Sequence, residues 1–280
     1  MENLWKKILI VSILIFVLCL TAFFQQTQKP KIATENDIKA DLELVPCKTD
    51  ERLEAVKKLF VKMGAAAEDL SVEKFKDVEN LVVTKKGKSN ETIIIGAHYD
   101  KTIEGCGAID NWTGIVIIAN LYRTMKDLNT EKTYKFVAFD KEEKYLIGST
   151  AMAKAISKDG GGNYCAMVNL DSFGFGYPQI LDNASSEKLS DLAKDLAKEL
   201  EMPFSHASLL GSADADSSSF KRIDIPAITL HGLSNDWKNY LHTSKDKLKN
   251  VNSNSVFIGY QFVLRYLMKI DSSPCNAFRK

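Results

Sequence analysis

The stretch KFVAFDKEEKYLIGS, residues 135–149, decides the fold. Four apolar residues, 136–139, predict a buried strand, and the run from Ile147 to Ser157 predicts a helix directly after it. Between the two lie Asp140, Glu142 and Glu143. Charged side chains between a buried strand and a helix are typical of open α/β sheets, in which ligands bind at the carboxyl ends of the strands.

The same alternation of strand and helix continues along the chain. It predicts an α/β fold, a three-layer sandwich with a mixed, mostly parallel central sheet flanked by helices. Residues 79–100 predict a hairpin that turns at residues 87–90, which would supply an antiparallel edge. The other predicted strands are 133–140, 164–174 and 225–232, and the predicted helices are 50–65, 114–128, 147–157, 186–201 and 254–269.

Charge and length bound the class of protein. The 280 residues carry 37 Lys and Arg against 36 Asp and Glu, a net charge of +1. This balance gives no basic footprint, so we expect no nucleic-acid partner. The length suits one sizeable domain, expected at residues 37–280, with residues 25–36 as a polar linker.

Residues 1–24 predict a signal or anchor segment. Lys6 and Lys7 precede an apolar run from Ile8 to Phe24, which is typical of export with the N-terminus in the cytoplasm. The run is short for a bilayer span and long for a signal-peptide core, and Cys19 adds a weak lipoprotein alternative. We therefore expect an exported protein, either membrane-anchored through this segment or secreted after cleavage.

Four cysteines lie beyond this segment: Cys47, Cys106, Cys165 and Cys275. Export permits disulfides, and we predict the pair Cys47–Cys275 because these two cysteines lie near the ends of the folded region. The chain has no CxxC spacing, so a cysteine zinc site is not expected.

Histidine and carboxylate side chains follow the predicted strands. They are His98 and Asp100, Glu142 and Glu143, Asp171 and, after a loop, His242, with Asp110 just before a helix. Mixed histidine and carboxylate ligands suit zinc, and two histidines with three carboxylates can hold two ions if one carboxylate bridges them. Taken singly, Asp110 could be only a helix N-cap and Asp171 only a turn residue. His206 and His231 are read as ordinary satisfied polar residues.

Six motifs, in order, resemble the zinc aminopeptidases related to bacterial leucyl aminopeptidase, yeast aminopeptidase Y and the glutamate carboxypeptidases. They cover roughly residues 75–270 and read GAHYDK (96–101), GAIDNWTGI (107–115), FDKEEKYLIGS (139–149), VNLDSFG (168–174), FKRIDIPAITL (220–230) and LHTSKDKL (241–248).

The resemblance implies a role for each matching residue. Asp110 would bridge two zinc ions, with Glu143 and His242 completing one site and His98 and Asp171 the other. Glu142 would be the general base. Asp100 would orient His98, and Asp246 the segment of His242.

The chain also departs from the pattern of this family. Ser217 replaces a usual histidine, although Asp216 before it is kept, and Asp224 replaces a usual glycine. Lys101 stands where a small polar residue is common. Tyr240 lies near, but not at, the offset of an oxyanion-stabilising tyrosine. Asp216 and Tyr240 therefore stay candidates for contacts with substrate or oxyanion.

Three functions compete at this stage. The first is a two-zinc aminopeptidase acting on peptides with a free N-terminus. The second is a glutaminyl cyclase, a relative that would need one zinc ion and would form N-terminal pyroglutamate. The third is a non-catalytic ectodomain on the same scaffold, which the complete ligand set disfavours.

Overall fold

An eight-stranded sheet with the order β1-β2-β4-β3-β5-β8-β6-β7 runs through the protein. A computed structural model describes residues 30–207 and 214–279. The strands are β1 (Leu70–Phe75), β2 (Val78–Lys85), β3 (Thr92–His98), β4 (Thr133–Phe139), β5 (Tyr164–Leu170), β6 (Gln179–Leu181), β7 (Ser205–Ala207) and β8 (Ala227–His231). The helices are α2 (Glu35–Leu42), α3 (Arg52–Lys62), α4 (Thr113–Met125), α5 (Ile147–Lys158), α6 (Glu187–Glu199), α7 (Asp216–Lys221) and α8 (Ser253–Ser272).

The centre of the sheet is parallel and its flanks contain the antiparallel pairs. Strand β3 pairs in parallel with β4 and β5, and β5 pairs in parallel with β8. Strand β2 is antiparallel to β1 and β4, and β6 is antiparallel to β8. The predicted mixed sheet is confirmed, and the carboxyl ends of β3, β4, β5 and β8 share one edge.

The predicted hairpin over residues 79–100 is wrong. Strand β4 lies between β2 and β3 and pairs with both of them. Every residue of β3 is buried, so β3 takes a central position instead of an edge beside β2. The hairpin at this flank is β1–β2, and its turn contains Lys76 at φ 58°.

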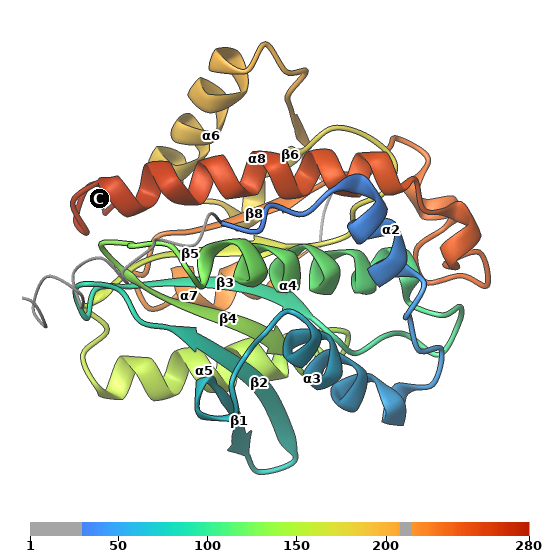
Figure 1. Ribbon diagram of the computed structural model, residues 1–280, viewed down its shortest axis with the longest axis horizontal. Helices are drawn as coiled ribbons and strands as arrows, with labels where there is room; N and C mark the ends of the chain where they lie inside the picture. The colour runs from blue at the N-terminus through green and yellow to red at the C-terminus, as the bar shows by residue number, and fades with distance from the viewer. Residues whose placement is uncertain (1–29, 208–213, 280) are drawn as a thin grey trace, which may run out of the picture. The chain divides into compact units, whose positions relative to one another are not determined.

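Helices cover both faces of the sheet, as Figure 1 shows. On one face α2, α3, α4, α6 and α8 pack on residues such as Ile93, Ile95 and Val168. On the other face α5 and α7 pack on Ile94 and Met167. Successive residues of a strand point to opposite faces, so the continuous apolar run of β3 supplies both cores. The three-layer sandwich is confirmed.

The described folded unit starts at Lys31, before the predicted domain boundary at residue 37. The amide of Ala33 donates to the Tyr260 hydroxyl at 3.1 Å, and Thr34 caps α2. Residues 31–36 of the predicted linker thus belong to the fold. The predicted signal or anchor, 1–24, and linker residues 25–29 lie outside the described residues. Within the described ranges, no helix has the length and apolar character needed to cross a membrane.

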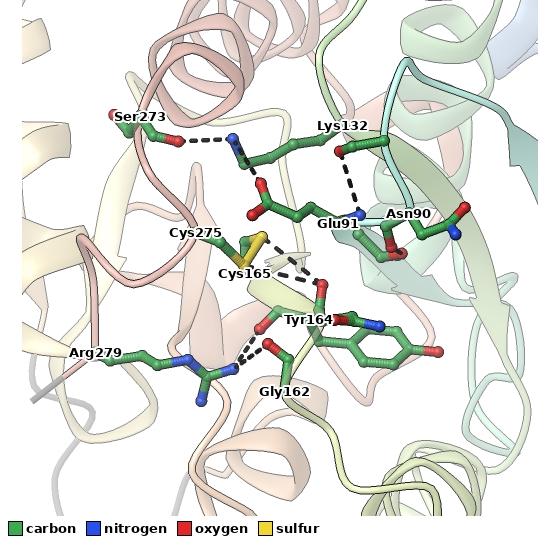
Figure 2. The surroundings of a disulfide bond; sticks show 12 residues. Asn90, Glu91, Lys132, Gly162, Tyr164, Cys165, Ser273, Cys275 and Arg279 are labelled. Carbon is green, nitrogen blue, oxygen red and sulfur yellow. Dashed lines mark hydrogen bonds and ion pairs between the residues drawn. A yellow bond between two sulfur atoms is a disulfide. The ribbon is translucent and has the colours of Figure 1, made fainter.

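Two disulfides, Cys47–Cys106 and Cys165–Cys275, replace the predicted Cys47–Cys275 pair. Cys47 precedes α3 and meets the loop that follows β3, at the carboxyl edge of the sheet. Cys165 is the second residue of β5, at the opposite edge, and Cys275 follows the end of α8 (Figure 2). The 20 residues of α8 span about 30 Å, so the chain's end lies far from Cys47 despite the terminal position of both cysteines in sequence.

Removing the Cys165–Cys275 disulfide should affect stability and leave the carboxyl edge intact. Cys165→Ser with Cys275→Ser opens a 110-residue loop and should cost about 2–4 kcal/mol of unfolding free energy. Urea denaturation measures the loss, and metal content measured in parallel should stay at the wild-type value. An unchanged denaturation midpoint would contradict the assignment of this disulfide.

Candidate metal centre

The shared carboxyl edge of the parallel strands gathers the residues predicted as ligands. His98 is the last residue of β3, Glu142 and Glu143 follow β4, and Asp171 follows β5. His242 comes from the segment after β8, and Asp110 lies in the irregular turn before α4. The edge therefore brings together five chain segments that are far apart in sequence.

Asp110 lies between the two histidines. Its Oδ1 is 3.1 Å from His98 Nε2, and its Oδ2 is 3.1 Å from His242 Nε2. Asp171 Oδ1 lies 3.7 Å from His98 Nε2, and Glu143 Oε2 lies 3.3 Å from His242 Nε2. The five side chains thus form two groups of three that share one carboxylate, with one imidazole and one further carboxylate in each.

The chemistry of this donor set fits divalent cations. In each group, one possible ligand atom per residue lies within 4.8 Å of the others. The Oε1 atom of Glu143 is buried and has no hydrogen-bond partner among the residues that the structure describes, an arrangement that is costly for a carboxylate unless a cation meets it. Imidazole nitrogen mixed with carboxylate oxygen favours zinc over magnesium or calcium.

Several pKa values in the site are raised because its carboxylates are buried close together. Burial, reinforced by the charge of Asp110, raises the pKa of Glu143 to about 8. Hydrogen bonding to Asp110 raises the pKa of His242 to about 9. Burial alone would lower the pKa of His98, but the carboxylate of Glu142 and its other acidic neighbours raise it well above its ordinary value. Without a metal ion, bound protons therefore offset the repulsion among these carboxylates. A bound metal ion would offset it in the same way.

Glu142 differs from Glu143 in its surroundings. Its Oε2 lies 3.9 Å from His98 Nε2, and burial raises its pKa well above the usual range. Within 4 Å the two glutamates thus meet different histidines, although one ligand atom each of His98, Glu142 and Glu143 also lies within 4.8 Å of the others.

Asp100 links the first histidine to the glutamate pair. Its Oδ1 lies 3.4 Å from His98 Nδ1 and accepts the Glu142 amide at 3.0 Å. Its Oδ2 accepts the Glu143 amide at 3.2 Å. A carboxylate behind a ligand histidine sets the tautomer and the ring orientation. Here the same carboxylate also holds the loop that carries both glutamates.

Asp246 holds the loop of Asp110, a contact that the sequence did not predict. Its carboxylate accepts the amides of Ile109 at 2.6 Å and of Asp110 at 3.3 Å, and its carbonyl accepts the amide of Cys106 at 2.7 Å. The side chain is buried, which raises its pKa to about 6. Asp246 thus ties the Asp110 turn to the segment that carries His242.

A cavity of about 320 Å³ opens beside these side chains. Besides the acidic cluster its lining includes the apolar side chains of Leu181, Leu233, Trp237 and Leu241, together with Asp214. Tyr240 is not part of this wall, since its ring packs on Phe175 with centroids 4.9 Å apart.

Asp216, the other residue predicted to contact substrate, is fully buried at the start of α7. Burial raises its pKa to about 7, and its charge acts on Glu142. Asp216 therefore lies behind Glu142 and not on the cavity surface that a substrate would contact.

His231 is a residue of the site that the sequence analysis set aside. It ends β8, lines the cavity and is 3% exposed. Its Nδ1 accepts the Leu233 amide at 3.3 Å, and its Nε2 has no partner among the described residues. Burial lowers its pKa to about 4, so the ring is neutral at pH 7. In the sequence, only the position of His231 at the end of an apolar strand indicates that it lies in the site.

Comparison with known proteins places the chain in peptidase family M28, whose model matches residues 80–266. The chain belongs to this family, as the six motifs predicted. It is 30% identical over 217 residues to a probable leucine aminopeptidase of Arthroderma otae, an alignment that takes in 70% of this chain and 58% of that protein. The chain therefore spans about three fifths of the length of this curated relative.

Two solved structures show the same fold. An aminopeptidase from Aneurinibacillus sp. strain AM-1 matches with a TM-score of 0.59 and 26% identity, over 69% of this chain and 48% of that one. A glutaminyl cyclase from an Acidobacteriales bacterium matches with a TM-score of 0.71 and 17% identity, over 85% of this chain and 93% of that one.

Asp246→Asn should weaken metal binding. The substitution removes the charge that holds two amides of the Asp110 turn, and losses of partners behind ligands typically cost about 10–100-fold in metal affinity. Competition with a chromophoric chelator measures the affinity for zinc. Asp236→Asn is the matched control, because Asp236 is exposed on the same segment and its carboxylate accepts a hydrogen bond only from Ser234 among the described residues. Equal zinc affinities in both variants would contradict the assigned contact.

Zinc binding should strengthen as pH rises from 6 to 9. Across this range His242, with a pKa of about 9, and Glu143, with a pKa of about 8, give up the protons they hold in the metal-free protein. Zinc needs these groups deprotonated, so binding should release protons at pH 7. Calorimetry in two buffers of different ionisation enthalpy counts them, and proton uptake or a pH-independent affinity would contradict the charge assignment.

Proposed function

We propose that the protein is a zinc-dependent aminopeptidase with two zinc ions and Glu142 as general base. One observation carries the proposal: Asp110 lies 3.1 Å from each of two histidines, and each histidine has a further carboxylate of its own. His98, Asp110 and Asp171 would hold one ion, and Asp110, Glu143 and His242 the other. Membership of peptidase family M28 supports the same reading.

The reaction is hydrolysis of the first peptide bond of a chain with a free N-terminus. Zinc would supply positive charge that polarises the scissile carbonyl and acidifies a water molecule. Glu142 takes a proton from the attacking water and passes it to the leaving amine nitrogen as the C–N bond breaks. Burial raises the pKa of Glu142, which is the direction that favours a group that must return a proton to the leaving amine.

The cavity wall supports an apolar N-terminal residue as the preferred one. Leu181, Leu233, Trp237 and Leu241 would surround its side chain and remove it from water. The leucine aminopeptidase among the relatives agrees with this preference. A panel of aminoacyl amides tests it, and faster turnover of charged than of apolar residues would contradict it.

Export remains part of the proposal. The apolar segment at residues 8–24 would direct the chain out of the cytoplasm, and two disulfides suit an oxidising compartment. Cell fractionation with an antibody against the folded domain tests it, and a cytoplasmic pool with free thiols would contradict it.

Glu142→Gln and Glu143→Gln should separate the two glutamates. Glu142→Gln should keep two zinc ions and lose about 10²–10⁴-fold in turnover, because the proton carrier is gone. Glu143→Gln should mainly lose zinc, because the substitution removes the charge of a metal ligand. Metal analysis and peptide hydrolysis, measured on the same preparations, distinguish the roles of the two glutamates. Unchanged turnover in Glu142→Gln would contradict its role as the base.

Glutaminyl cyclase is the second candidate, and one observation favours it. The fold aligns over 93% of the cyclase structure with a TM-score of 0.71, against 48% and 0.59 for the aminopeptidase structure. Assays of the same zinc-loaded protein with a glutaminyl peptide and with a leucyl peptide distinguish the two activities. Release of leucine without pyroglutamate supports the aminopeptidase, and pyroglutamate without leucine would establish the cyclase.

A further inference from the structure

Arg52 is a fully buried guanidinium behind the metal centre. It is the first residue of α3, its exposed fraction is 0%, and its guanidinium carbon lies 5.6 Å from the centre of the Trp112 ring. Burying such a cation is costly unless its donors are satisfied. The contacts that satisfy it therefore show what this residue holds.

The donors of Arg52 bond four main-chain carbonyls. Its Nε donates to Tyr99, and its Nη1 donates to Pro46 at 3.0 Å and to Cys106 at 2.9 Å. Its Nη2 donates to Gly107 at 3.2 Å. One side chain thus joins the segment before α3, the end of β3 and the loop that leads to Asp110.

Two of these carbonyls lie next to ligand positions. Tyr99 stands between His98 and Asp100, so its carbonyl sets the course of the chain at both residues. Gly107 adopts φ +60° and begins the turn that carries Asp110. A Cβ at Gly107 would lie 2.7 Å from Lys101 Cβ, 3.0 Å from the Asp110 carbonyl oxygen and 3.1 Å from Arg52 Nη1, so this turn is closely packed against the guanidinium and Lys101.

The charge of Arg52 also faces the acidic site. Burial lowers its pKa to about 10, and Asp100, Asp246, Asp110 and Glu143 act in the opposite direction. Arg52 is therefore a cation at pH 7 within the field of these carboxylates. The planar fork of arginine reaches several acceptors at fixed angles, which a lysine ammonium cannot do.

We propose that Arg52 is a positioning residue of the metal centre, which sets His98 and Asp110 at the spacing that two metal ions need. It acts through the carbonyls of Tyr99, Cys106 and Gly107 and does not touch the metals or the substrate. The inference rests on the proposed function, because it assumes that His98 and Asp110 bind metal.

The test compares Arg52→Lys with wild type and with two controls. Arg265→Lys makes the same change at an exposed arginine that bonds the Gln261 carbonyl. The Cys165→Ser, Cys275→Ser variant loses stability at the far edge of the sheet. Three quantities are measured on each protein: zinc affinity by chelator competition, the visible absorption spectrum of the cobalt-substituted protein, and the midpoint of urea unfolding without metal.

Arg52→Lys should bind zinc about 10–100-fold more weakly and show an altered cobalt spectrum. Both controls should keep the wild-type affinity and spectrum, although the disulfide variant unfolds at lower urea. If Arg52→Lys loses stability but keeps the wild-type zinc affinity and cobalt spectrum, Arg52 only stabilises the fold and the inference is overturned.

Gly107→Ala tests the same contact from the loop side if Arg52→Lys does not fold. Its Cβ would crowd Lys101, the Asp110 carbonyl oxygen and Arg52 Nη1 at a positive φ, so the turn should shift away from the guanidinium and bind zinc more weakly. Wild-type affinity in this variant would overturn the inference. A wild-type protein that binds neither zinc nor cobalt would overturn the proposed function, and with it this inference. If wild type binds metal and the variants keep the wild-type metal affinity, the inference is overturned but the proposed function is not.

Discussion

The carboxylate of Asp110, placed between His98 and His242, is the contact on which the rest of the site depends. Both imidazole nitrogens lie 3.1 Å from it, one at each oxygen. A small shift of the Asp110 turn would lengthen one of these distances and shorten the other. The turn is therefore held from several directions: by Asp246 through two amides, and by Arg52 through the carbonyl of Gly107.

The sheet topology explains how the remaining residues reach Asp110. Parallel strands deliver their carboxyl ends to one edge, and helices on both faces keep the strands in register. Glu142 and Glu143, adjacent after β4, face His98 and His242 respectively. Two neighbouring carboxylates that look redundant in sequence thus have different partners, which is the basis for assigning them different roles.

Much of this arrangement could be predicted from the sequence, because strand ends and residue types are local properties. The apolar run 136–139 predicted a strand, and the charged residues after it predicted that the end of this strand belongs to the site. The pairing of strands could not be predicted, since β4 lies between β2 and β3 but begins 55 residues after β2 begins, at Thr133 against Val78. The disulfides depend in the same way on where α8 ends in space.

Residues outside the six motifs, and residues near them without a matching offset, were the hardest to place from the sequence. Arg52 looks like a surface position of an amphipathic helix until the carbonyls around it are known. His231 ends an apolar strand and has no motif of its own. Tyr240 had a suggestive spacing, but its ring packs on Phe175 because the segment after β8 folds back there.

Anomalous diffraction at the zinc edge, from crystals of the zinc-loaded protein, is the most direct test of the central claim. We expect two peaks about 3.5–4 Å apart, one on each side of the Asp110 carboxylate. A single peak, or two peaks that Asp110 does not bridge, would contradict it.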